Sequence, residues 1–164
     1  MNFPSGLRPA QPGDEARLYA LFVTAHAENG HGDIDHEAVK SVIARICRGE
    51  NSIAGIVDGP DRIEAAIALH PEKRWYSTDA PENWYHTDLL IYVHPLHRRS
   101  RHAVKLFQFA KWWEAETHMP VVLGLMPKDD LEEKDHLFAR FGRRVGSLYL
   151  IGGDEMWPQR TGTS

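Results

Sequence analysis

The sequence DLLIYVHPLHRRSRHAVKLF, residues 88–107, contains the pattern that best indicates the fold and the site of this protein. Its first part, Asp88 to His94, is mostly apolar and predicts a strand, which Pro95 ends because proline cannot continue a central ladder. Its last part begins the strongest amphipathic helix of the chain. The apolar face of that helix carries Ala103, Leu106, Phe107, Ala110 and Trp113. The segment is therefore a strand, a short loop and a helix.

The loop of this unit, residues 97–102, contains three arginines and two histidines. A helix N-terminus presents unpaired N–H groups and partial positive charge, so arginines beside it favour a phosphate or pyrophosphate. The whole chain has 19 basic and 23 acidic residues and a net charge of −4, against which this cluster stands out. An exposed, solvated basic turn is the alternative interpretation.

Hydrophobic spacing outside this unit predicts the remaining elements. Helices are expected over 14–29, over 36–48 after the N-cap residue Asp35, and over 131–141. A Gly-Pro turn joins strands 52–57 and 62–69 as an antiparallel pair. Residues 70–85 hold two prolines and the aromatic residues Trp75, Trp84 and Tyr85, and we expect a long loop there. Residues 121–126 read as a strand buried on both faces, and 145–151 as the final strand.

Length and composition indicate one globular domain over residues 1–154, followed by a polar tail, 155–164. The chain has 164 residues, of which 42% are hydrophobic, and Cys47 is the only cysteine. No apolar run approaches the ~20 residues of a membrane helix, and the N-terminus lacks the features of a signal peptide. We therefore expect a cytoplasmic protein without a membrane partner, and the negative charge argues against nucleic acid as a partner.

The segment 88–98 and its helix resemble the signature of the GNAT superfamily of acyl-CoA-dependent N-acetyltransferases. The loop pattern of that superfamily, Gln/Arg-x-x-Gly-x-Gly/Ala, falls on residues 98–103, where Arg98 and Ala103 match and Arg101 occupies the first glycine position. Residues 7–10 resemble its opening strand and 137–142 its closing helix. The resemblance implies an α/β (α+β) fold with a mixed, mostly antiparallel sheet and helices on both faces.

The resemblance also implies acetyl-CoA as cosubstrate and a place for it. The pantetheine arm would lie along the main chain of Ile91, Tyr92 and Val93, and Phe138 would lie beside the sulfur. The pyrophosphate would contact the loop residues Arg98, Arg99, Ser100, Arg101, His102 and Ala103. We expect the side chain of His102 to be exposed at the helix start.

The catalytic groups are less clearly indicated. The family positions for a general base fall on Thr87 and Leu89, so either an ordered water transfers the proton or His86 and Asp88 act through a bulge that re-aims the strand. Polar residues facing solvent at a strand end are the alternative. Phe138 occupies the usual position of a tyrosine proton donor, so solvent or Tyr149 would have to protonate the thiolate.

Acceptor-binding candidates come from the first two helices and the stretch before the signature strand: His26, Glu28, Trp84 and Tyr85. Glu28 could attract a cationic amine, and the aromatic rings could make cation–π contacts. An ordinary surface carboxylate and ordinary packing are the alternatives. His94, His97 and His102 have no cysteine or carboxylate partner in their pattern, so no metal is expected.

The function that these features predict is transfer of an acetyl group from acetyl-CoA to a primary amine of a small molecule or peptide. A GNAT-like module that binds acyl-CoA or CoA without turnover is one alternative. An atypical member that modifies a nucleobase is another. Assembly as a homodimer is left open by the sequence.

Overall fold

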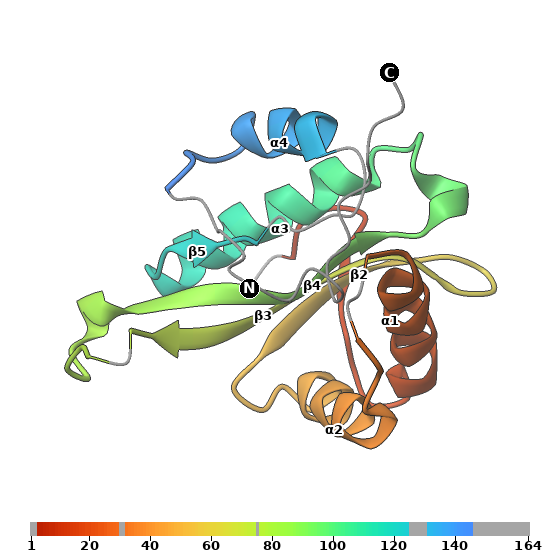
Figure 1. Ribbon diagram of the computed structural model, residues 1–164, viewed down its shortest axis with the longest axis horizontal. Coiled ribbons are helices and arrows are strands. Elements are labelled where there is room, and N and C mark those ends of the chain that lie inside the picture. The colour runs from red at the N-terminus through yellow and green to blue at the C-terminus, as the bar shows by residue number, and fades with distance from the viewer. Residues whose placement is uncertain (1–2, 30–31, 75, 125–130, 146–164) are drawn as a thin grey trace.

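The computed structural model describes residues 3–29, 32–74, 76–124 and 131–145, and Figure 1 shows their arrangement. The strands are β1 (Arg8–Pro9), β2 (Ile53–Asp58), β3 (Ile63–Lys73), β4 (Trp84–Val93) and β5 (Val121–Val122). The helices are α1 (Glu15–Asn29), α2 (His36–Cys47), α3 (His102–Thr117) and α4 (Leu131–Ala139). Two 3₁₀ turns, η1 (Pro81–Asn83) and η2 (Pro95–His97), flank β4.

The five strands form one sheet in the order β1-β2-β3-β4-β5. Neighbours from β1 to β4 pair antiparallel, and β4 pairs with β5 in parallel. Helices α1 and α2 cover one face of the sheet, and α3 covers the other, with α4 packed outside α3 (Figure 1). The predicted mixed, mostly antiparallel sheet with helices on both faces is confirmed. No helix in the described part of the chain is long and apolar enough to cross a membrane.

The two helices on the first face form where the sequence predicts them. Asp35 caps α2, because its side chain accepts a hydrogen bond from the Ala38 N–H at 3.0 Å. The apolar stripe of α2 packs with that of α1 on Ile56 and Ala66 of the sheet. Cys47 ends this stripe with only 2% of its surface exposed, and burial raises the pKa of its thiol to about 11.

The second face is closed by α3, whose Leu106 and Phe109 pack against Ile67 and Leu69 of β3. Gly55 of β2 is required here, since a Cβ at that position would lie 2.7 Å from the Phe109 ring. Helix α4 is held on α3 by aromatic contacts. The Phe107 ring stacks on Phe141 at 4.5 Å between centroids and meets Phe138 edge-on at 4.9 Å.

A network of ion pairs joins β1, α1 and the end of β2. Asp14, which is 4% exposed, accepts two hydrogen bonds from the Arg8 guanidinium at 2.7 and 2.8 Å. Arg8 and Arg17 also pair with Asp58. The hydrogen bond from Arg8 outweighs burial and lowers the pKa of Asp14. The short β1 strand is thereby fixed to the start of α1.

The predicted loop over 70–85 is wrong at both ends. Strand β3 continues to Lys73 and β4 begins at Trp84, so the connection covers only residues 74–83. Pro71 is tolerated because the last β2 partner of β3 is at Leu69, and beyond it β3 pairs with β4 alone. The aromatic residues Trp84 and Tyr85 suit a strand position.

The predicted strand over 121–126 is present at its start, since β5 covers Val121 and Val122. Its expected burial on both faces is wrong, because Val122 is 38% exposed. Residues 125 and 126 lie outside the described residues. The predicted final strand, of which only Val145 is described, and the polar tail lie outside them as well.

Candidate functional site

The parallel pair β4–β5 separates soon after it forms. Only His86 and Thr87 of β4 have partners in β5, namely Val121 and Val122. Past this point the Asp88 carboxylate, and not the β4 backbone, accepts the Gly124 N–H at 2.6 Å. Within the described residues, the main chain of β4 from 89 to 93 therefore has β3 on one edge and no strand on the other. Unpaired main-chain groups at a strand edge can bind an extended ligand.

A β-bulge lies at the point of separation. In the β3–β4 register, Ala68 pairs with Leu90 while the next residue, Leu69, pairs with Asp88, so Leu89 is the extra residue. A bulge bends its strand and re-aims the neighbouring side chains. The structure thus contains a bulge, which the alternative with His86 and Asp88 requires.

Asp88 is the ionisable side chain at this bulge. Burial raises its pKa above the ordinary aspartate value, and the hydrogen bond from the Gly124 N–H opposes that shift without cancelling it. A carboxylate with a raised pKa is a better proton acceptor near neutral pH than an ordinary one. Asp88 is therefore a carboxyl group of raised pKa beside the open edge of β4.

His86 and Thr87 differ from Asp88 in their surroundings. His86 is 4% exposed, its Nε2 accepts a hydrogen bond from the indole N–H of Trp113 at 3.0 Å, and burial lowers its pKa. These features give His86 a packing role between β4 and α3. Thr87 lies in register between His70 of β3 and Val122 of β5. The sequence does not show which of His86, Thr87 and Asp88 is suited to proton transfer, because their surroundings depend on tertiary packing.

The loop before α3 has a conformation that needs no glycine. Arg101 has a φ of −88°, so a side chain is accommodated at the position where the GNAT pattern has its first glycine. The Ser100 hydroxyl accepts the His102 N–H at 3.1 Å and shapes the entry into α3. Arg99 and Arg101 are exposed, and neither has a side-chain partner among the described residues. Two of the three arginines that the sequence places beside this helix N-terminus are therefore free among the described residues.

Arg98 is held differently from its neighbours. Its guanidinium pairs with the Glu28 carboxylate at the end of α1, and the same oxygen accepts the Tyr92 hydroxyl at 2.6 Å. Burial by itself would raise the pKa of Glu28, but the hydrogen bonds from Tyr92 and Arg98 outweigh it and lower that pKa. Burial and the bond to Glu28 raise the pKa of Tyr92 to about 12. This cluster ties α1 to the end of β4.

The four residues expected to bind the acceptor are not gathered in one place. Glu28 and His26 lie at the end of α1, near Tyr92, and the His26 ring lies beside Phe22. Trp84 and Tyr85 begin β4, so some eight residues, or roughly 26 Å of strand, separate them from Tyr92. Glu28 is already occupied by Arg98 and Tyr92, which makes it a poor partner for an acceptor amine.

Two adjoining hollows lie between α2 and the strands, and the sequence gives no separate signal for either. The apolar pocket, about 220 Å³, is lined by Leu18, Phe22, Ala38, Val39, Val42, Ile43, Ile46, Ala68, Leu89 and Leu90. The polar groove, about 750 Å³, is lined by Val42, Arg45, Glu50, Asn51, Ser52, His70, Pro71, Trp84 and Leu89. Leu89 at the bulge and Val42 line both. Of the four predicted acceptor residues, only Trp84 lines one of these two hollows.

The expectation that His102 is exposed is wrong. Its side chain is 13% exposed, and its Nε2 lies 2.7 Å from a carboxylate oxygen of Glu64. The statement that these histidines lack a carboxylate partner is wrong for the same reason. Glu64 is 38 residues away in the sequence, at the start of β3, and only the sheet brings it to the start of α3.

Comparison with known proteins finds similar solved structures but no similar sequence. No protein-family model matches the sequence, and no curated protein matches it. A solved GCN5-related N-acetyltransferase from Ralstonia eutropha is 19% identical with a TM-score of 0.66, covering 89% of this chain and 96% of that one. A predicted acetyltransferase with acetyl-CoA from Clostridium acetobutylicum is 12% identical with a TM-score of 0.71, covering 91% and 96%.

A third solved structure is AAC(6')-Iy in complex with the bisubstrate analogue CoA-S-monomethyl-acetylneamine. It is 13% identical with a TM-score of 0.65, and the match covers 89% of this chain and 96% of that one. The chain is thus a mixed α+β protein whose parallel strand pair separates in front of a helix N-terminus. Its fold is that of the GNAT acetyltransferases.

Proposed function

We propose that this protein is an acetyl-CoA-dependent N-acetyltransferase that acts on a primary amine. The observation that carries the proposal is the open edge of β4, which runs from the bulge at Leu89 to the basic loop before α3. Such an edge suits an extended arm with a reactive group at one end and phosphates at the other. The acetyl-CoA and CoA-analogue complexes named among the similar folds support this cosubstrate.

In this proposal the pyrophosphate lies at the start of α3, where the free N–H groups and the cations of Arg99 and Arg101 meet it. Ser100, His102 and Ala103 belong to the same loop. The His102 N–H, which the Ser100 hydroxyl accepts, reaches a phosphate only when that hydroxyl turns away. The pantetheine arm follows the main chain of Ile91, Tyr92 and Val93 and places the thioester near the bulge. Arg98 shapes the loop through its bond to Glu28.

The reaction needs a neutral amine and a proton acceptor. The amine nitrogen attacks the thioester carbonyl carbon, its proton passes to the Asp88 carboxylate, and the carbon–sulfur bond breaks to release the CoA thiolate. Solvent then protonates the thiolate. Asp88 takes the role of base because it combines a raised pKa with a place beside the separated strands. His86 and Thr87 precede Asp88 in β4 and hold this part of the strand against β5 and α3.

The acceptor would approach from the side of the apolar pocket and the polar groove, which meet at Leu89. An amine with an apolar part fits this pair, because one hollow is lined by aliphatic and aromatic side chains and the other by charged and polar ones. Trp84 would contact it in the groove, and Tyr85 continues β4 beside Trp84. His26 would lie at the margin.

A binding module without turnover is the second candidate, and Phe138 favours it. Its ring packs on Phe107 of α3 and carries no proton to donate to a thiolate. A module of this kind would hold acetyl-CoA on the same edge of β4 and would release no thiol with any acceptor.

One experiment separates the two candidates. The purified chain is incubated with acetyl-CoA and a panel of primary amines, and both free thiol and the mass of each amine are recorded. Thiol release together with an amine heavier by one acetyl group supports the enzyme. Calorimetric binding of acetyl-CoA without either signal supports the module. Absence of both binding and turnover overturns both candidates.

A further inference from the structure

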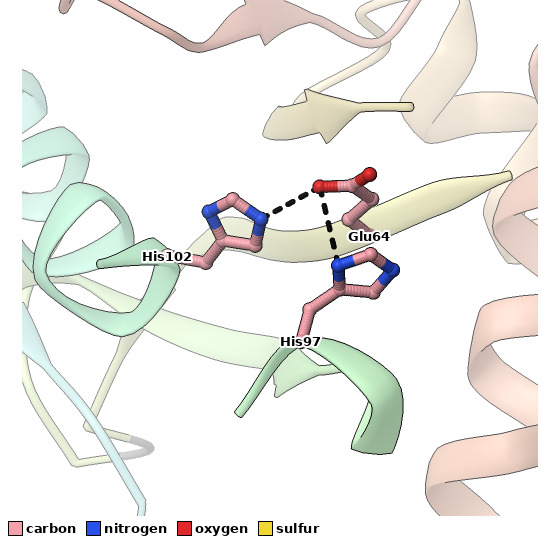
Figure 2. A group of neighbouring side chains, drawn as sticks. All are labelled: Glu64, His97 and His102. Carbon is pink, nitrogen blue, oxygen red and sulfur yellow. Dashed lines mark hydrogen bonds and ion pairs between the residues drawn. The ribbon is translucent and has the colours of Figure 1, made fainter. Parts of the chain in front are cut away.

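Three side chains beside the proposed pyrophosphate loop converge on one point, as Figure 2 shows. A Glu64 carboxylate oxygen lies 2.7 Å from Nε2 of His102 and 3.6 Å from Nδ1 of His97. One ligand atom from each residue lies within 4.8 Å of the other two. Two imidazoles and one carboxylate directed at a common point are a donor set that binds transition-metal ions.

The backbone fixes all three residues independently of any ion. Glu64 lies near the start of β3, where its carbonyl accepts the His94 N–H at 2.8 Å. His97 ends the turn η2, and His102 is the first residue of α3. Their side chains are 17%, 29% and 13% exposed, in the same order. The cluster is therefore half-buried, held by three rigid elements and still reachable from solvent.

The two distances to the Glu64 carboxylate are close to those that one ion requires, and the nitrogens of His97 and His102 lie within 4.8 Å of each other. Zinc binds imidazole nitrogen and carboxylate oxygen at about 2.0–2.2 Å, so two ligands of one ion lie about 3–3.5 Å apart. The Glu64–His97 separation of 3.6 Å fits this value, and the Glu64–His102 separation of 2.7 Å needs a shift of well under 1 Å. Such a shift requires no backbone movement, since the Glu64 carboxylate can turn about its side-chain torsions.

We propose that Glu64, His97 and His102 form a binding site for a divalent transition-metal ion of the Zn²⁺ type. Three protein ligands leave at least one coordination position for water or another donor. His97 and His102 flank the loop 98–101, so the ion joins both ends of that loop to β3. The site does not depend on the proposed acetyl transfer, and it can be tested without acetyl-CoA.

The alternative is an ion-pair network in which Glu64 only accepts a hydrogen bond from His102 and pairs with His97. Calorimetry with Zn²⁺ on tag-free protein stripped by a chelator distinguishes the two, and Mg²⁺ serves as the comparison because it prefers oxygen ligands. We expect one Zn²⁺ per chain and no binding of Mg²⁺ at this site. Zn²⁺ should also raise the melting temperature, because it binds only the folded arrangement.

Glu64→Gln and His97→Gln test the site without opening a large cavity. Each should weaken Zn²⁺ binding about tenfold or more and remove the Zn²⁺-dependent rise in melting temperature. His118→Asn is the matched control, since His118 is an exposed histidine at the other end of α3 whose φ of 57° asparagine tolerates. It should leave Zn²⁺ binding unchanged.

Two results would overturn the site: wild-type protein that binds no Zn²⁺, or Zn²⁺ affinity that both glutamine variants leave unchanged. Melting curves recorded without metal show that each variant is folded. Failure of this site leaves acetyl transfer untouched, because the thiol-release assay contains no Zn²⁺. If the protein binds Zn²⁺ through these residues but shows no acetyl transfer, the metal site stands and only the proposed enzyme activity is contradicted.

Discussion

At the scale of single residues, Asp88 decides whether the proposed chemistry can occur. Replacing it with asparagine preserves an oxygen that can accept the Gly124 N–H, so the separated strands should keep their arrangement. Loss of a general base typically lowers kcat by about 10²–10⁴-fold. We expect Asp88→Asn to show this loss while acetyl-CoA affinity, measured by calorimetry, stays the same. An unchanged kcat would assign proton transfer to another group.

The pH profile gives an independent test of Asp88. The base acts in its ionised form, and its pKa in the folded protein is raised by burial. The kcat/KM value should therefore increase with pH through that raised pKa, above the range of an ordinary aspartate. The profile of Asp88→Asn should lack this acidic limb. A wild-type limb at the ordinary aspartate value would contradict the assignment.

Phe138 tests the proton donor. Tyrosine keeps the ring that packs edge-on against Phe107 and adds a hydroxyl where the GNAT resemblance places the donor. Phe138→Tyr should leave turnover similar or increase it, and a binding module should gain measurable transfer. A buried hydroxyl without a partner costs about 1–3 kcal/mol, so melting is recorded beside the thiol-release rate. A folded variant with reduced turnover would contradict a proton-donor role for this position.

At the scale of elements, the loop before α3 determines cosubstrate affinity. The Arg98 guanidinium is engaged by Glu28, which leaves Arg99 and Arg101 as the cations available to a pyrophosphate. The double variant Arg99→Ala, Arg101→Ala should weaken acetyl-CoA binding by about 1.5–3 kcal/mol for each lost charged hydrogen bond. The matched control is Lys40→Ala with Arg48→Ala, an equal loss of charge on and beside α2. Equal affinity in the two double variants would place the pyrophosphate elsewhere.

The helices and strands could be predicted where hydrophobic spacing and end signals in the sequence agree. The apolar stripes of α1, α2 and α3 and the Asp35 cap of α2 can be predicted because a helix depends only on its own period and ends. The hairpin β3–β4 is longer than its sequence suggests, because pairing across the sheet lets Pro71 remain in a strand. The Glu64–His102 contact has no local signal, since two elements 38 residues apart create it. The sequence does not show which strands and helices lie side by side. That arrangement decides which polar side chains come into contact.

At the scale of the whole molecule, the ion-pair network around Asp14 joins the first strand to the core. Asp14→Asn removes the carboxylate that accepts two hydrogen bonds from Arg8, whose side chain is 30% exposed. We expect the free energy of unfolding at pH 7, measured in urea, to fall by about 1.5–3 kcal/mol. A change below about 0.5 kcal/mol would show that Asp58 alone suffices to hold Arg8.

The pH dependence of this effect has a definite sign. The pKa of Asp14 is lower in the folded protein than its unfolded value of 3.8. Its contribution is therefore fully present above pH 3.8 and is lost as pH falls through the lowered folded value. The difference in unfolding free energy between wild type and Asp14→Asn should shrink on acidification below pH 3.8. A difference that stays constant there would contradict an ionised Asp14 as its source.

The buried thiol of Cys47 can be used to measure local opening of the folded chain. The only sulfhydryl of the sequence ends α2 with 2% of its surface exposed, and its pKa of about 11 keeps it protonated at neutral pH. A thiol reagent therefore labels native protein only when the α1–α2 layer lifts from the sheet. The labelling rate divided by that of a fully exposed cysteine gives the equilibrium constant for this local opening, and from it the free energy of opening. The free thiol of coenzyme A that turnover releases would react with the same reagent at once. The fast signal of coenzyme A and the slow signal of Cys47 can therefore be separated in one recording.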